Sequence, residues 1–217
     1  VDMYELLAHT TSRENLANQL IGQAVASGLD GLNVDFESLD RSCGPAYIQF
    51  IRELAIKCHN NGIVLSIDDY VPSESTEFYN RKEQGIVADY VIIMGYDEHW
   101  GTSKESGSVA SIGFVEAGIK DTLEDVPKEK LINAIPFYTR LWTETTDANG
   151  QVNVTSKTYD MNTSKELLYA SSNLVEWNEE CGQYYGGYVN DDGSVCKMWL
   201  EDARSIEEKM KLIDKYD

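Results

Sequence analysis

The chain has 217 residues, of which 42% are hydrophobic and 10% aromatic, a composition that can bury a core and that excludes a disordered protein. The formal net charge of −19 argues against nucleic acid as a partner, because phosphate groups repel an acidic surface. No run of about 18 uninterrupted apolar residues occurs, which predicts that the chain has no transmembrane segment.

Strand and helix patterns alternate along the first two thirds of the chain. Residues 11–14 (T-S-R-E) have the spacing of a capping box and predict a helix that ends near Gly28. A strand is expected from Leu29 to Phe36, and then a helix with Pro45 in its first turn. The later expected elements are a strand at 63–67, a helix at 74–84, a strand at 90–96, a helix at 109–123 and a strand at 131–137. This alternation predicts an α/β fold with a parallel sheet.

The last third of the chain departs from that rhythm. Residues 142–200 are rich in Thr, Asn, Tyr and Gly, and Asp191-Asp192-Gly193 is typical of a hairpin turn. A final helix is expected from Ala203 to Tyr216. We therefore predict three segments, which are an α/β part at 1–141, an α+β insertion at 142–202 and the last helix at 203–217.

The cysteines and histidines predict neither a metal site nor a cofactor. The four cysteines match no zinc-binding spacing, and the three histidines are scattered. Cys58 lies on an apolar helical face and is expected in the core. Cys181 and Cys196 flank the expected hairpin, and the sequence leaves open whether they form a disulfide.

The segment 30–37 (D-G-L-N-V-D-F-E) is the most informative part of the chain. Because side chains alternate along a strand, Asn33, Asp35 and Glu37 share one face and the apolar residues between them share the other. A solvated strand end with acidic residues would explain one such side chain, but three in a row are rarer. Repulsion between two neighbouring carboxylates favours a proton on one of them, which suits acid catalysis.

Three segments resemble glycoside hydrolase family 18. Residues 30–37 resemble the D-G-x-D-x-D-x-E motif, with Asn33 where many chitinases have the second Asp. That form resembles the branch of bacterial spore cortex-lytic N-acetylglucosaminidases. Met94 to Asp97 (M-G-Y-D) is similar to the M-x-Y-D at the end of the sixth barrel strand. Pro136 to Trp142 (P-F-Y-T-R-L-W) is similar to the seventh-strand segment of the same branch.

The resemblance covers nearly the whole chain and implies a fragment of a (β/α)8 TIM barrel. A complete barrel has eight strands and typically about 250 residues. By this alignment the chain supplies strands four to seven, with the insertion after the seventh, and Val1 is expected to be a cut edge. Open sheet edges expose backbone, so we expect that such a fragment pairs with a second copy or that proteolysis has trimmed a longer chain. The resemblance implies a location in the cell wall, the spore or the extracellular space.

The implied activity is hydrolysis of β-1,4-linked N-acetylglucosamine glycans with retention, assisted by the substrate's own acetamido group. Glu37 would be the acid/base, Asp35 would stabilise the charged intermediate, and Tyr96 would hold the acetamido oxygen. The residues expected to contact or border the sugar are Asn33, Met94, Asp97, Tyr138 and Arg140. Asp68, at the end of the expected second strand, is a further candidate.

Several alternatives remain open at this point. The chain could be a carbohydrate-binding protein of the same family without catalysis, although such members usually lack the Glu at position 37. It could also be an inactive fragment, or belong to a chitinase and not to a peptidoglycan-cleaving enzyme. An unrelated open α/β domain would need a Gly-rich phosphate-binding turn, and Gly31 alone does not supply one.

Overall fold

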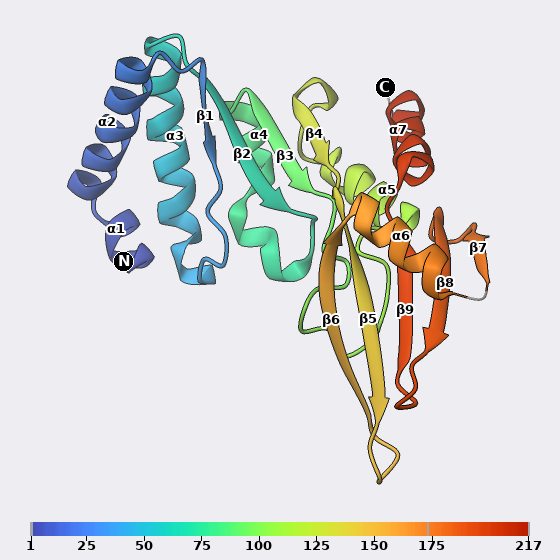
Figure 1. Cartoon of the computed structure of the whole chain (residues 1–217). Helices are drawn as coiled ribbons and strands as arrows, with labels where there is room; N and C mark the ends of the chain where they lie inside the picture. Colours follow the sequence, from blue (N-terminus) through green and yellow to red (C-terminus); the bar gives the residue numbers. More distant parts are fainter. Residues whose placement is uncertain (1, 173, 217) are drawn as a thin grey trace. The chain divides into compact units, whose positions relative to one another are not determined.

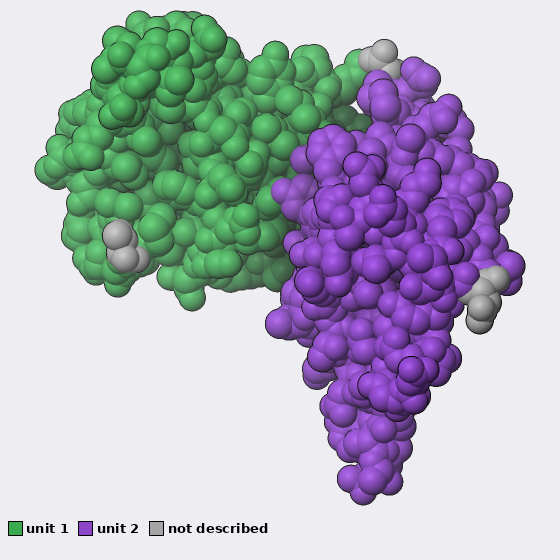
Figure 2. All heavy atoms as spheres, viewed as in Figure 1, with its two compact units in different colours: residues 1–94, 118–133 green, residues 95–117, 134–217 purple. Residues whose placement is uncertain are grey.

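The computed structural model describes residues 2–172 and 174–216, which contain a four-stranded and a five-stranded sheet (Figure 1). The chain divides into two compact units (Figure 2). The first comprises the residues up to 94 together with 118–133, and the second comprises 95–117 and the residues from 134 onward. Among the described residues, no helix has the length and apolar character that crossing a membrane requires.

The first unit has the expected alternation of strands and helices. Its elements up to residue 94 are α1 (Met3–Ala8), α2 (Thr10–Ser27), β1 (Gly31–Val34), η1 (Arg41–Cys43), α3 (Gly44–Asn60), β2 (Val64–Tyr70), η2 (Glu74–Tyr79), α4 (Arg81–Val87) and β3 (Tyr90–Met94). The sheet order is β1-β2-β3-β4, where β4 is Leu131–Ala134. β1 and β3 both run parallel to β2, and Asn33 pairs with Ser66. The prediction of a parallel sheet is confirmed for these three strands.

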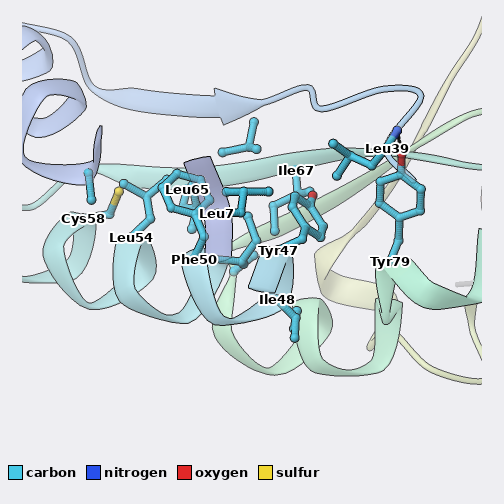
Figure 3. Close-up of a cluster of buried hydrophobic side chains, with 14 of the residues drawn as sticks. Leu7, Leu39, Tyr47, Ile48, Phe50, Leu54, Cys58, Leu65, Ile67 and Tyr79 are labelled. Atoms are coloured by element: carbon cyan, nitrogen blue, oxygen red, sulfur yellow. Dashed lines mark hydrogen bonds between the residues drawn. The ribbon is translucent and has the colours of Figure 1, made fainter. Parts of the chain in front are cut away.

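One side of the first sheet is covered by α3, as Figure 3 shows. Tyr47, Phe50 and Leu54 recur at helical spacing on α3 and are fully buried, against Leu65 and Ile67 of β2. Burial of each such side chain contributes about 1.5–3 kcal/mol to stability. This core fixes β1 and β2 side by side and leaves the polar residues of β1 on the opposite face.

The second unit is built around an antiparallel sheet. Its strands and helices are β5 (Tyr138–Thr146), β6 (Val152–Asp160), α6 (Met161–Ser171), β7 (Val175–Asn178), β8 (Gln183–Val189), β9 (Val195–Leu200) and α7 (Ala203–Tyr216). The strand order is β6-β5-β9-β8-β7. Leu168 of α6 packs on Met198 and Leu200 of β9. Helix α5 (Ile112–Thr122) contributes residues to both units, and η3 (Lys128–Lys130) belongs to the first unit, before β4.

Several local predictions are confirmed. The last helix spans Ala203–Tyr216, and Pro45 lies in the first turn of α3. Gly28 adopts the left-handed conformation that ends α2, and Gly193 takes a φ of 84° in the turn between β8 and β9. Cys58 is buried in the core as expected.

The predicted capping box at residues 11–14 is wrong. Helix α2 already begins at Thr10, and no side chain caps its first turn. Arg13 instead donates from Nη1 to the Leu7 carbonyl at 2.7 Å and from Nη2 to Glu53 Oε1 at 3.0 Å. The end of α1 needs partners for its carbonyl groups, and Arg13 supplies one.

Element boundaries also differ from those predicted. The helix expected at 74–84 is interrupted at Asn80, which has a φ of 59° and whose side chain accepts the Glu83 N–H at the start of α4. The strand expected at 131–137 ends at Ala134, and Tyr138 begins β5. Pro136 lies between them and cannot donate a ladder hydrogen bond.

Two further outcomes concern residues named above. Tyr138 and Arg140 lie on an antiparallel strand, not at the end of a barrel-type strand. The open question about the cysteines is settled, since Cys181 and Cys196 are both free.

Candidate active site

Asn33, Asp35 and Glu37 are all exposed on one face of the first unit. Between them Val34 is buried, and the Phe36 ring stacks on Phe50 with centroids 5.8 Å apart. β1 itself ends at Val34, so the expected strand to Phe36 is too long, yet the alternation continues through Glu37. The apolar residues anchor the segment, and the polar ones are left accessible to a ligand.

Two tyrosine hydroxyl groups hold the loop that carries Glu37. Tyr79 Oη donates to the Phe36 carbonyl at 3.1 Å and accepts the Leu39 N–H at 3.2 Å, the latter bond being drawn in Figure 3. Tyr70 Oη accepts the Ser38 N–H at 3.0 Å and donates to Glu37 Oε2 at 3.4 Å. Because both tyrosines come from elements after α3, the position of Glu37 depends on the tertiary fold.

Asn33 connects the first strand to the second. Ser66 Oγ donates to Asn33 Oδ1 at 2.7 Å, and Asn33 Nδ2 donates to Asp68 Oδ2 at 2.8 Å. Burial raises the pKa of Asp68 above its usual range, the Asn33 hydrogen bond lowers it, and the negative charge of Asp35 raises it further. Asp68, the additional sequence candidate, therefore lies among the polar residues of this face.

A buried ion pair lies on the opposite face of β2. Burial raises the pKa of Asp69 to about 6, although Arg81 Nη2 lies 3.4 Å from its Oδ1. Gln84 Nε2 donates to Asp69 Oδ2 at 3.2 Å, and Arg81 Nη2 also donates to the Tyr70 carbonyl at 2.9 Å. The pair thus fixes the backbone that carries Tyr70.

A hollow of about 360 Å³ borders Asp35 and Glu37. Its lining residues are Met3, Leu6, Leu16, Asp35, Phe36, Glu37 and Leu39. Most of this lining is apolar. The hollow therefore offers an apolar contact surface for the C–H groups of a ligand, next to the carboxylates of Asp35 and Glu37.

The second unit holds another polar group around Asp97, which takes a φ of 57°. Tyr138 Oη donates to Asp97 Oδ1 at 2.5 Å, and the Tyr96 and Tyr138 rings meet edge to face at 6.4 Å. Burial raises the pKa of Tyr138, and the hydrogen bond to Asp97 raises it further. The Tyr138 hydroxyl therefore remains a neutral donor.

Arg140 is held close to the same group. Its Nη1 donates to Ser156 Oγ at 3.0 Å, and its guanidinium lies 5.7 Å from the centre of the Trp142 ring. A hollow of about 450 Å³ is lined by Phe137, Tyr138, Arg140, Thr158, Tyr159 and Asp160. An aromatic ring, a cation and hydroxyl groups around one hollow are suited to binding a sugar.

Comparison with known proteins identifies the family. The model of the glycosyl hydrolases family 18 matches residues 2–217. The chain belongs to glycosyl hydrolase family 18. It therefore has the α/β fold of the TIM-barrel type.

Relatives of this family 18 chain include two proteins of Bacillus subtilis strain 168. It is 26% identical over 220 residues to the putative sporulation-specific glycosylase YdhD, which covers 99% of this chain and 51% of that protein. It is also 26% identical over 217 residues to a cortical fragment-lytic enzyme, covering 96% of this chain and 49% of that protein. The chain thus spans about half the length of these curated relatives.

Solved structures agree with the family assignment. The crystal structure of YdhD superposes with a TM-score of 0.88 at 26% identity, covering 97% of this chain and 70% of the other. A chitinase from Chromobacterium violaceum shares the fold with a TM-score of 0.85 at 24% identity, over 95% of this chain and 64% of the other.

The predicted site residues of this family 18 chain fall into two groups. Asn33, Asp35, Glu37 and Met94 belong to the first unit, and Met94 is half-buried at the end of β3, paired with Tyr70. The second unit contains the others, which are Tyr96, Asp97, Tyr138 and Arg140. Within residues 2–172 and 174–216, no three His, Cys, Asp or Glu side chains are grouped so as to hold a metal ion.

The sequence prediction missed Tyr70, Tyr79 and Phe137. Nothing in the residues next to the two tyrosines marks them in the sequence, so only their hydroxyl contacts distinguish them. Phe137 has 69% of its surface exposed, next to the predicted sugar contact Tyr138. An aromatic residue beside a polar motif at a strand end is the pattern that could have indicated it.

Proposed function

We propose that this chain carries the catalytic acid of a retaining glycoside hydrolase that cleaves β-1,4-linked N-acetylglucosamine glycans. The observation that carries the proposal is the row of Asn33, Asp35 and Glu37, exposed together at the carboxyl end of a parallel strand in a family 18 chain. Active sites of barrel enzymes lie at that end of their strands.

Glu37 acts as acid and then as base in the proposed mechanism. The carbonyl oxygen of the substrate's acetamido group attacks the anomeric carbon while Glu37 gives its proton to the leaving oxygen. The resulting positively charged oxazolinium is opened by water, and Glu37 takes up the proton of that water. The Tyr70 hydroxyl, 3.4 Å from Glu37 Oε2, supports the carboxyl group in position.

Asp35 and Tyr96 orient the acetamido group in this proposal. Asp35 accepts the acetamido N–H and stabilises the positive charge of the oxazolinium, and Tyr96 donates to the acetamido oxygen. Asn33 orients Asp35, since it is itself fixed by Ser66 and Asp68. The proposed sugar contacts are Asp97, Tyr138 and Arg140, with Met94 as a packing residue of the pocket.

The finer fold assignment belongs to the same proposal. β1 to β4 correspond to strands four to seven of the barrel, residues 142–202 to the insertion, and residues 203–217 to the last barrel helix. Because β1 and β4 lie at the ends of the strand order, we also propose that a second copy pairs at an open edge. A monodisperse monomer in light scattering would contradict that pairing.

We propose a peptidoglycan of the spore cortex type as the substrate, ahead of chitin. Asn33 and the sequence Tyr138-Thr139-Arg140 favour it, as do the names of the sporulation-specific and cortical fragment-lytic relatives. A neutral or weakly charged glycan also suits a chain with a net charge of −19 better than a polyanion.

Cleavage of acetylated and de-N-acetylated oligosaccharides tests the function. The assay compares this chain with a version extended to eight barrel strands, and Glu37→Gln is the control in both. Cleavage of the acetylated substrate alone, lost in Glu37→Gln, is expected. Binding without cleavage by the extended version would indicate a carbohydrate-binding protein, and cleavage by the extended version alone would indicate that this part is inactive by itself.

A further inference from the structure

Three buried polar side chains of the first unit have no part in the proposed mechanism. Asp69, Arg81 and Gln84 are 1%, 5% and 0% exposed. Charged side chains are rarely buried to this extent. A buried ion pair often contributes little net stability, because both charges lose their hydration. The burial of these three side chains is therefore better explained by the groups that they hold in place.

Arg81, the first residue of α4, binds the end of β2. Its Nε and Nη2 both donate to the Tyr70 carbonyl, at 3.2 and 2.9 Å, and Nη2 also donates to Thr76 Oγ1 at 2.8 Å. The donors of a guanidinium lie in one rigid plane, so two bonds to a single carbonyl restrain both groups. The last residue of β2 is thus held from the core side of the sheet.

Gln84 lies one turn after Arg81 on α4 and binds the second tyrosine. Its Nε2 donates to the Tyr79 carbonyl at 2.9 Å and to Asp69 Oδ2 at 3.2 Å. The other oxygen of the same carboxylate, Asp69 Oδ1, lies 3.4 Å from Arg81 Nη2. One buried carboxylate therefore fixes the positions of the two donors relative to each other.

The side chains of both tyrosines lead from this cluster to the loop that carries Glu37. Adjacent residues of a strand point to opposite faces, so Asp69 is in the core while Tyr70 faces the loop. Tyr70 Oη contacts Glu37 Oε2 at 3.4 Å, and Tyr79 Oη binds the backbone on either side of Glu37. The two rings meet edge to face at 5.7 Å. A shift of either tyrosine is therefore transmitted to the Glu37 carboxyl group.

We propose that Arg81 and Gln84 are positioning residues that act on the Glu37 loop from the core side of the sheet. Arg81 acts through Tyr70, and Gln84 acts through Tyr79. This proposal rests on the proposed function for its catalytic meaning. Misplacing a reacting group by about 1 Å can cost up to about 10²-fold in rate, so side chains that never touch the substrate can still set the rate.

The first arm of the test uses NMR on the whole chain and needs no activity. Arg81→Lys keeps a cation beside Asp69 but loses the planar set of donors, so the fold should be retained while the Tyr70 carbonyl is released. The Ser38 N–H, which donates to Tyr70 Oη at 3.0 Å, reports the position of that side chain. We expect Arg81→Lys to move the Ser38 amide resonance in the same direction as Tyr70→Phe does.

Arg52→Lys is the matched control for this arm. Arg52 Nε binds the same helix α4, through Glu83 Oε1 at 2.7 Å, but its side chain is 39% exposed and it lies outside the buried cluster. The control should leave the Ser38 amide resonance unmoved. An unmoved Ser38 resonance in Arg81→Lys, or an equal movement in Arg52→Lys, would overturn the role given to Arg81.

Gln84→Met tests the second connection and leaves the buried ion pair in place. The new side chain has a similar size but no donor for the Tyr79 carbonyl. We expect the amide resonance of Leu39 to move, because its N–H donates to Tyr79 Oη at 3.2 Å. An unmoved Leu39 resonance would overturn the role given to Gln84, and this result can be obtained even if Arg81→Lys does not fold.

The second arm measures kinetics in the form of the protein that cleaves an acetylated oligosaccharide. Glu37 acts in the chemical step, so Arg81→Lys should lower kcat about fivefold and leave KM unchanged. The same loss is expected for Tyr70→Phe. Because Arg81 acts through Tyr70, the double variant should also lose about fivefold, whereas independent effects would multiply to about 25-fold. A change in KM alone, or the full product of the two losses, would contradict the positioning role.

The two arms also separate this proposal from the proposed function. If no form cleaves a glycan but the Ser38 and Leu39 resonances respond as expected, the proposed function falls and the connection from α4 to the Glu37 loop remains. If Arg81→Lys cleaves the glycan at the starting rate, the proposed function remains and the positioning role falls.

Discussion

Two sets of carboxylates, one in each unit, lie in opposite environments. At the edge of the parallel sheet, Asp35 and Glu37 are exposed. In the second unit, Glu201 is fully buried, and Lys209 Nζ lies 2.8 Å from its Oε1. An exposed carboxylate can exchange protons and contact a ligand, whereas a buried one must be matched by donors before the fold is stable.

The donors around Glu201 come from distant parts of the second unit. Ser205 Oγ donates to Glu201 Oε2 at 2.9 Å, Gln183 Nε2 donates to Oε1, and the Glu201 N–H reaches Thr139 Oγ1 at 2.9 Å. Through its carboxylate and its backbone N–H, Glu201 thus connects β5, β8 and α7. Burial still raises the pKa of Glu201, with Lys209 acting in the other direction. The comparison predicts that changes at the sheet edge affect activity and that changes at Glu201 affect stability.

The largest effect is expected for Lys209→Met. The side chain of Lys209 is 2% exposed, and its removal leaves Glu201 without its counter-ion. Loss of one partner of a buried ion pair costs about 3–5 kcal/mol. Urea unfolding would measure the cost, with Lys211→Met as the matched control. Lys211 pairs with Glu208 at the surface and should show no measurable change, and equal losses in both variants would contradict the comparison.

Asp35→Asn should lower the rate of the reaction by nearly as large a free energy as Lys209→Met lowers stability. It should leave stability almost unchanged. A group that stabilises developing charge contributes about 10²–10³ to kcat, whereas Asp35 is exposed and its ionisation supports no part of the core. Turnover of an acetylated substrate and the unfolding midpoint would be measured on the same preparation. A large loss of stability would place Asp35 among the structural carboxylates.

Asp69 extends the comparison into the first unit, because it is buried and its pKa is raised from 3.8 to about 6. Between these values the folded state binds a proton that the unfolded state does not, so this group makes the protein more stable as the pH falls from about 6 to about 4. The contribution is of order 2–3 kcal/mol. Unfolding at several pH values should show this gain in the starting protein and its loss in Asp69→Asn. If the unfolding free energies of the starting protein and of Asp69→Asn changed with pH in the same way, the raised pKa of Asp69 would be contradicted.

The smallest effect is expected for Tyr70→Phe. The change removes the hydroxyl that accepts the Ser38 N–H and donates to Glu37. The expected loss is about 1 kcal/mol in transition-state stabilisation, or roughly fivefold in kcat/KM. Tyr79→Phe is the matched variant, since Tyr79 holds the same loop through Phe36 and Leu39. It should lower the unfolding free energy more than the activity. The reverse result would exchange the roles given to the two tyrosines.

Local features of the sequence determined a large part of the fold. The period of the apolar residues indicated α3 and the parallel strands, and the helix Ala203–Tyr216 was predicted at its true bounds. The alternation in residues 30–37 also indicated the shared face of Asn33, Asp35 and Glu37, which the structure retains although β1 ends at Val34. The period of apolar residues and the residues that favour turns act over a few positions, so they can be identified from the local sequence without knowing which segments pack together.

Boundaries were predicted less well where a distant residue or a single backbone conformation decides them. Arg13 is separated from its partner Glu53 by 40 positions, and this contact replaces the local cap that the sequence suggested. Asn80 interrupts the expected helix because its left-handed backbone and side chain begin α4. Pro136 separates β4 from β5, which changes the strand to which Tyr138 belongs.

By itself the sequence determined the polar row at the end of β1, its resemblance to a family 18 motif, and the alternation of helices and strands. Only the tertiary structure showed that Asn33 binds Asp68, that Tyr70 and Tyr79 hold the Glu37 loop, and that Glu201 is buried with Lys209. The physical reason is that side-chain periodicity is a property of each segment, whereas a hydrogen-bond partner depends on strand register and on which faces pack together.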